Sequence, residues 1–153
     1  MKRLGIIVMC VVFVGSGLAY ANWFRKLGPT TSGYTFHVHQ STDTIYYYSQ
    51  GMPDPASNEA WTWPPSATIS VSVHDANYKW VDGVQIEMTA EGQLKGQVEI
   101  SPSTLTTQNG KAMATVSLSG EGPELGEGKI NVKVENIVHG VNLAIEQAPV
   151  SGF

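Results

Sequence analysis

The stretch Ile69–Ala90 reads ISVSVHDANYKWVDGVQIEMTA and decides the fold class. In residues 69–73 isoleucine and valine alternate with serine, which is the two-residue period of a half-buried β-strand. A second alternating run covers residues 84–89. Between the two runs, Asp75 and Asn77 have side chains that bond nearby backbone groups, so they predict a turn. Two short strands, each with one apolar face, indicate an all-β protein.

The same alternation continues toward the C-terminus, and no long segment has a helical period. Six or seven short strands, each with one apolar face, in about 80 residues are typical of a β-sandwich. Asn109-Gly110 favours positive φ angles and suits a tight hairpin. His139-Gly140 is predicted to be a two-residue hairpin turn between the last two strands. The further alternating runs are residues 98–100, 112–118, 130–134 and 141–145.

Residues 1–21 have the features of a secretory signal peptide. Lys2 and Arg3 provide the positive start, residues 4–18 are apolar, and Ala-Tyr-Ala closes the segment. The apolar run is short for a membrane helix, which needs about 20 residues. We therefore expect an exported mature chain without a membrane span. Cys10, the only cysteine, lies inside this signal, so no disulfide is expected.

The expected mature chain has two parts of different character. Residues 22–66 are irregular and rich in aromatic residues and proline, and Pro64-Pro65 marks their end. We expect these residues to form an N-terminal extension to a β-sandwich over residues 67–147. Residues 148–153 form a C-terminal tail.

Charge and motifs exclude several classes of function. The formal net charge is −4, from 9 Lys and Arg against 13 Asp and Glu. Removal of the signal peptide takes away Lys2 and Arg3, which leaves 7 − 13 = −6. Such a chain has no electrostatic attraction to nucleic acid or anionic lipid. No Gly-x-Ser-x-Gly, His-Glu-x-x-His or phosphate-loop motif occurs. We therefore expect neither an enzyme nor a cofactor.

The stretch Ile69–Ala90 resembles the opening of a bacterial Ig-like domain of the invasin/intimin type. The resemblance rests on turn residues in this stretch and on STLTTQNGKAMATVSLSG and GEGKINVKVENIVHGVNLAIE further on. Tyr78 stands where the family often has Gly, and Trp80 where it often has Pro. The resemblance implies an exported, non-catalytic sandwich used in adhesion or as a spacer. The matching residues are Asp75, Asn77, Val81, Gly83, Thr107, Gly110, Ala112 or Ala114, and Leu118.

His37 and His39 are candidate metal ligands. They lie two residues apart in the predicted strand TFHVHQ, so both imidazoles share one face. Two ligands are too few for a structural zinc site, and His74 or Asp43 could complete the set. The alternative is a strand face that is solvated or hydrogen-bonded. We interpret Asp75 and the nearby Asp82 as turn-forming residues rather than calcium ligands.

Aromatic residues are the other candidate binding residues. Tyr and Trp combine a large apolar area with a polar group, which suits interfaces and sugar-stacking surfaces. The alternative is that the extension folds over the sandwich and buries them. The residues concerned are Tyr46, Tyr47, Tyr48, Trp61, Trp63 and Trp80.

The sequence as a whole predicts a cell-envelope or extracellular component, located at the cell surface or in the periplasm, that acts in adhesion or structure. Its expected partner is a protein or a glycan at the cell surface. Two alternatives stay open. One is a filament subunit that self-associates by adding a strand from residues 33–50 to a neighbouring sandwich. The other is a small metal- or carbohydrate-binding module.

Overall fold

The computed structural model of the chain describes residues 25–27, 29–48, 63–120 and 122–149. These residues form ten β-strands and no helix. None of them therefore belongs to an apolar helix long enough to cross a membrane. The expected signal peptide, residues 1–21, lies outside the described residues. The predicted all-β fold is confirmed.

Two five-stranded sheets build the sandwich. Sheet A has the strand order β1-β2-β4-β8-β6, and sheet B has the order β3-β10-β9-β5-β7. Neighbouring strands are antiparallel except β3 and β10, which are parallel. The orders β2-β4-β8-β6 and β5-β9-β10 correspond to the ABED and CFG sheets of an Ig-like sandwich. The strands are β1 (Arg25–Leu27), β2 (Thr35–Gln40), β3 (Thr44–Tyr47), β4 (Ser66–His74), β5 (Gln85–Gly92), β6 (Val98–Ser101), β7 (Thr104–Thr106), β8 (Lys111–Leu118), β9 (Gly126–Val134) and β10 (Ile137–Gln147).

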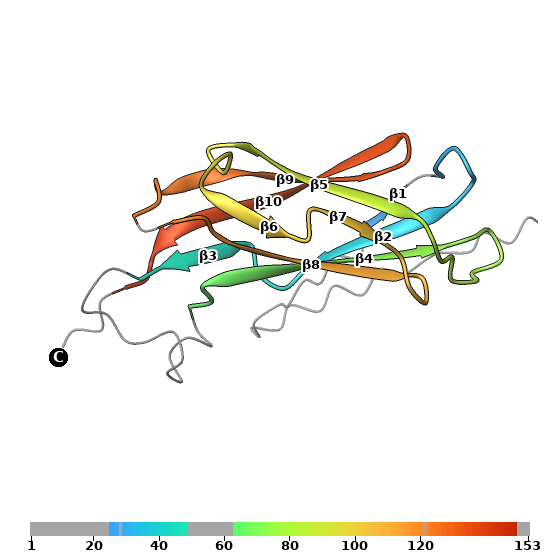
Figure 1. The fold of residues 1–153 in the computed structure, drawn as a ribbon, viewed down its shortest axis with the longest axis horizontal. Coiled ribbons are helices and arrows are strands. Elements are labelled where there is room, and N and C mark those ends of the chain that lie inside the picture. Colours follow the sequence, from blue (N-terminus) through green and yellow to red (C-terminus); the bar gives the residue numbers. More distant parts are fainter. Residues whose placement is uncertain (1–24, 28, 49–62, 121, 150–153) are drawn as a thin grey trace, which may run out of the picture.

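Alternation along the strands places the apolar residues of both sheets in one core. Figure 1 shows β5, β9 and β10 in one layer, with β4 and β8 in the other. In β4, Ile69, Val71 and Val73 are buried, whereas the serines between them are partly exposed. Because every second side chain faces the opposite sheet, the apolar pattern also fixes the strand register. The largest fully buried side chains are Phe36, Ile45, Ile69, Ile86, Met88, Leu94, Ile130 and Ile145.

The described part of residues 22–66 belongs to both sheets. β2 pairs with β4 in sheet A, and β3 pairs with β10 in sheet B, so the chain changes sheets between β2 and β3. Phe36 of β2 and Ile45 of β3 are completely buried in the core. The sandwich thus includes strands before residue 67, which differs from the boundary expected from the sequence. The reason is that local alternation reveals a strand but not the sheet in which it pairs.

The structure has the predicted tight turn at Asn109-Gly110, but this turn does not join two paired strands as a β-hairpin would. Asn109 has φ 51° and Gly110 has φ 70°. Gln108 and Lys111 exchange two backbone hydrogen bonds of 2.9 and 3.0 Å across the turn. The flanking strands β7 and β8 belong to different sheets, so this turn carries the chain from sheet B to sheet A.

The predicted hairpin turn at His139-Gly140 is wrong, because both residues lie within β10. The turn between β9 and β10 is at Glu135-Asn136, where Glu135 has φ 52°. Hydrogen bonds from residues far away in the sequence stabilise the turn at this position. The Glu135 carboxylate accepts a hydrogen bond from the Ser32 N–H at 3.0 Å, and Asn136 Oδ1 accepts one from the Thr31 N–H at 2.7 Å. Glycine permits a turn but does not impose one.

Candidate functional site at one end of the sandwich

The loop between β4 and β5 (residues 75–84) is shaped by Asp75. Its Oδ1 accepts hydrogen bonds from the Asn77 N–H at 2.8 Å and the Lys79 N–H at 2.9 Å. The Asp75 N–H in turn donates to the Lys79 carbonyl at 2.9 Å. The predicted turn-forming role of Asp75 is therefore confirmed. These bonds hold the tip of the loop in one conformation and expose the side chain that follows Asn77.

Tyr78 occupies that exposed tip with an unusual backbone. Its φ is 61°, in the left-handed region that favours glycine. For a residue with a Cβ this conformation costs about 1–2 kcal/mol. The side chain is 74% exposed, so core burial does not offset that cost. Its ring stacks on the His74 imidazole, with ring centroids 5.1 Å apart and planes inclined by 24°.

Trp80, two residues after Tyr78, packs on Gly110 of the turn between β7 and β8. A Cβ added at Gly110 would come within 2.5 Å of the Trp80 Cβ, so the indole residue sits directly on that glycine. Asp82 Oδ1 accepts a hydrogen bond from the Gly110 N–H at 2.7 Å, which fixes the turn against the loop. The Lys111 ammonium lies 5.7 Å from the centre of the Trp80 ring, within cation–π range. Trp80 is nevertheless 55% exposed.

Two histidines from different strands meet at this end. His37 and His39 share the outer face of β2, as predicted, because Phe36 and Val38, which alternate with them, are buried. The partner of His37 is His74 of β4, since their Nε2 atoms are 3.1 Å apart. His74 also lies on the outer face, but the loop covers it and leaves it only 7% exposed.

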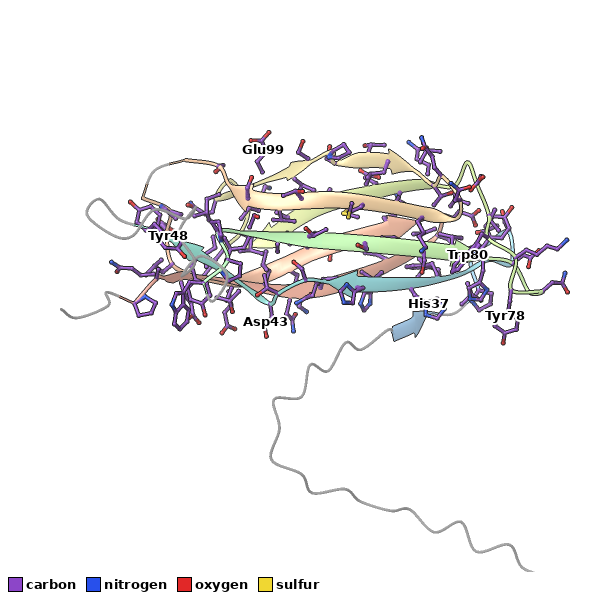
Figure 2. The ribbon with its side chains drawn as sticks, turned by 90° about the horizontal axis from the view of Figure 1, so that it is seen from below. His37, Asp43, Tyr48, Tyr78, Trp80 and Glu99 are labelled. Atoms are coloured by element: carbon purple, nitrogen blue, oxygen red, sulfur yellow. The ribbon has the colours of Figure 1, made fainter. Side chains whose placement is uncertain are left out.

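The same face carries an open groove of about 550 Å³. His37 and His39 line one side, and Lys111 and Met113 of β8 line the other. Met113 is 63% exposed. Sheet register places the small Ser70 and Ser72 of β4 between these walls, opposite His39 and His37 on one side and Met113 and Lys111 on the other. Figure 2 shows His37, Tyr78 and Trp80 gathered at this end of the sandwich.

A second aromatic group lies at the opposite end, where Figure 2 shows Tyr48. Tyr46 contacts Trp63 edge-to-face with ring centroids 4.9 Å apart, and the Tyr48 hydroxyl donates to the Trp63 carbonyl. The pKa of Tyr46 is raised, first by burial and then by the negative charges of Glu146 and Asp43. All three aromatic residues are partly buried.

The candidate residues are thus divided between two ends of the molecule. Trp80 lies at the end with His37 and His39, whereas Tyr46, Tyr48 and Trp63 lie at the other, as does partly buried Tyr47 at the end of β3. Trp61 lies outside the described residues. Asp43 does not join the histidines, because β3 belongs to the other sheet. In the part of the chain that the structure describes, no three His, Cys, Asp or Glu residues are arranged to hold a metal ion.

Three residues at the end with His37 and Trp80 were not singled out as binding residues from the sequence. Lys111 and Met113 lie on a strand far from β2 in sequence, and only sheet register brings them to the groove. Tyr78 did have a signal in the sequence, because it stands where the family that the chain resembles often has glycine. A bulky residue with positive φ is uncommon and indicates a candidate functional position for testing.

Comparisons with known proteins support the fold. No protein-family model and no curated protein matches the chain. The solved structure of FdeC, an adhesin of Escherichia coli, matches with a TM-score of 0.50 and 14% identity, over 74% of this chain and 31% of that chain. The adhesin InvE of Yersinia pseudotuberculosis matches with a TM-score of 0.47 and 13% identity, over 77% of this chain and 32% of that chain. The ZirS C-terminal domain matches with a TM-score of 0.48 and 14% identity, over 94% of this chain and 86% of that chain.

This chain therefore spans about a third of the length of the two adhesin structures. Identities this low establish the fold alone. The likeness to FdeC, together with the strand order, defines the protein as an Ig-like β-sandwich.

Proposed function

We propose that the protein is an exported, non-catalytic Ig-like component of the cell envelope or extracellular space that acts in adhesion or structure. The observation that carries this proposal is the exposed aromatic end formed by Tyr78 and Trp80. Tyr78 keeps a left-handed backbone and a largely exposed ring, an arrangement that costs stability without adding to the core. The fold shared with the FdeC adhesin supports the same class of function.

The partner we propose is a glycan at the cell surface, held in the groove and against the neighbouring Trp80, whose ring contacts the groove residue Lys111. The volume of about 550 Å³ falls in the range of small-ligand sites and suits one or two sugar rings. The groove offers serine hydroxyls, imidazoles and an ammonium for hydrogen bonding. Exposed tyrosine and tryptophan rings provide apolar faces for the C–H groups of a sugar.

Assembly into a filament by strand addition receives less support. The segment proposed to add to a neighbour contains β2 and β3, and both pair with strands of their own chain. The outer strands of the described sheets are β1, β6, β3 and β7, which have three or four residues each. Short edge strands disfavour pairing with another chain.

A glycan array and a cell-surface binding assay test the proposal. Tyr78→Gly restores the residue common in the family and removes the ring, and Trp80→Ala removes the indole. Each variant should lose at least tenfold in binding while the fold is retained. Trp63→Ala, at the opposite end, is the matched control and should bind normally.

The controls separate the alternatives. Loss of binding in Trp63→Ala with normal binding in Trp80→Ala would contradict the proposed site and place binding at the opposite end of the sandwich. Binding to cells that is insensitive to enzymatic removal of their glycans would replace the glycan with a protein partner. The absence of any binding, to a broad array or to cells, would contradict the adhesion role itself.

A further inference from the structure

The two histidines at the aromatic end have the spacing of metal ligands. A divalent transition metal binds imidazole nitrogen at about 2.0–2.1 Å. Two such ligands are then separated by about 2.9 Å at a right angle and by about 3.3 Å at a tetrahedral angle, from the same bond length. The observed distance between the Nε2 atoms of His37 and His74, 3.1 Å, lies between these values.

The tautomer of His74 follows from its other hydrogen bond. Its Nδ1 lies 2.9 Å from the Asp75 carbonyl oxygen, which can only accept, so Nδ1 carries the proton. The Nε2 atom of His74 therefore presents a lone pair toward His37. An imidazole that donates its second N–H to a backbone carbonyl is the usual arrangement around a bound metal, because it fixes the tautomer and the ring orientation.

The rings are also held in place by their neighbours. Tyr78 stacks on His74, and the Trp80 ring contacts it edge-on at 6.3 Å between centroids. His37 lies on β2, and its register with Ser72 of β4 fixes its position across from the His74 strand. Figure 2 shows His37 beside Tyr78 and Trp80. The pair therefore requires little ordering to act as a two-ligand clip.

From this geometry we infer that His37 and His74 form a binding site for a divalent transition metal, with Cu²⁺ bound most tightly. The order of affinities follows from the preference of nitrogen ligands, which is greatest for Cu²⁺. The two Nε2 atoms are the protein ligands, and water fills the other coordination positions. In the metal-free pair, His37 Nε2 carries the proton and donates it to His74 Nε2. Metal binding requires the other neutral tautomer of His37, so this proton moves from Nε2 to Nδ1 of the same ring and no proton is released.

This pair differs from the pair that the sequence suggested. His37 and His39 are neighbours along β2, whereas His37 and His74 are brought together by the register of β2 with β4. The metal site does not depend on the proposed glycan function, and the two proposals are tested by separate experiments.

Titration of the purified, untagged protein with CuCl₂ tests the site. Isothermal titration calorimetry should give one Cu²⁺ per chain, and electron paramagnetic resonance should show two nitrogen ligands. His37→Gln and His74→Gln should each weaken binding at least tenfold. His39→Gln and His139→Gln are controls with the same loss of one imidazole, and both should bind like the parent.

Two results would overturn the inference. The first is equal affinity in the parent and in the His37→Gln/His74→Gln double variant. The second is a loss with His39→Gln that His74→Gln does not share, which would restore the pair along β2. Circular dichroism checks that each variant is folded before its metal binding is compared with that of the parent. As a second readout, excess Cu²⁺ should raise the thermal midpoint of the parent and not that of a folded variant.

Discussion

The contact between Trp80 and Gly110 can be tested by adding a single methyl group. Gly110→Ala would place its Cβ 2.5 Å from the Trp80 Cβ and 3.0 Å from the Trp80 Cα, on a backbone with φ 70°. Gly83→Ala is the matched control, because Gly83 has φ 78° but no atom within 4 Å of the added Cβ. Both variants force alanine into the left-handed region, and only the first also creates a steric clash.

The expected magnitudes follow from these two terms. The left-handed backbone costs about 1–2 kcal/mol, and the less flexible unfolded chain offsets about 0.4–1 kcal/mol of it. Gly83→Ala should therefore lower the free energy of unfolding by about 1 kcal/mol. The clash at Gly110 adds about 1–3 kcal/mol. Gly110→Ala should thus be less stable than Gly83→Ala by about 2 kcal/mol.

Urea unfolding followed by circular dichroism measures both variants. At a slope of about 2 kcal/mol per molar urea, the two midpoints should differ by about 1 M. A double-mutant cycle then isolates the contact, with Trp80→Gly rather than Trp80→Ala as the second change, because alanine retains the Cβ that clashes. The two changes should couple by about 1 kcal/mol or more. Equal midpoints for Gly110→Ala and Gly83→Ala would refute the packing of Trp80 on the turn.

Two further predictions concern the ends of the strands. Asp75→Ala removes the carboxylate that accepts two loop N–H groups, and it should cost about 1–2 kcal/mol in urea unfolding, with Asp75→Asn in between; an unchanged midpoint would contradict the capping role. The pKa of Glu135 is lowered from its usual value, mainly by the hydrogen bond from the Ser32 N–H. Because the folded pKa is the lower one, the stabilisation is fully present above the usual glutamate pKa of about 4.3 and is lost as pH falls through the folded pKa. Glu135→Gln should therefore lose less stability between pH 6 and pH 3 than the parent, and a carboxyl pKa at or above the usual value, measured by NMR titration, would refute this.

Several features of the fold could be derived from local sequence. The alternation of Ile69, Val71 and Val73 with serine was enough to predict a strand and its buried face. Asn109-Gly110 predicted a tight turn, since its backbone requires φ values that few residues adopt. Both signals are local, because they depend on the direction of neighbouring side chains or on the conformational freedom of one residue.

Other features depended on contacts between distant residues. His139-Gly140 has turn chemistry, yet the turn forms at Glu135-Asn136, where both side chains bond the segment before β2. The predicted boundary at residue 67 left β2 and β3 outside the sandwich. The alternation within a strand predicts the strand but not the neighbouring strand with which it pairs.

The sequence by itself determined the class of fold, the buried faces and the outward position of His37 on its strand, since all three follow from the two-residue period of a strand. Only the tertiary structure decided which residues share a site. The register of β2 with β4 brings His37 to His74, and the register of β4 with β8 brings Lys111 and Met113 to the other side of the same groove. Strand pairing is set by the packing of the whole core, so a site built across three strands cannot be read from any one of them.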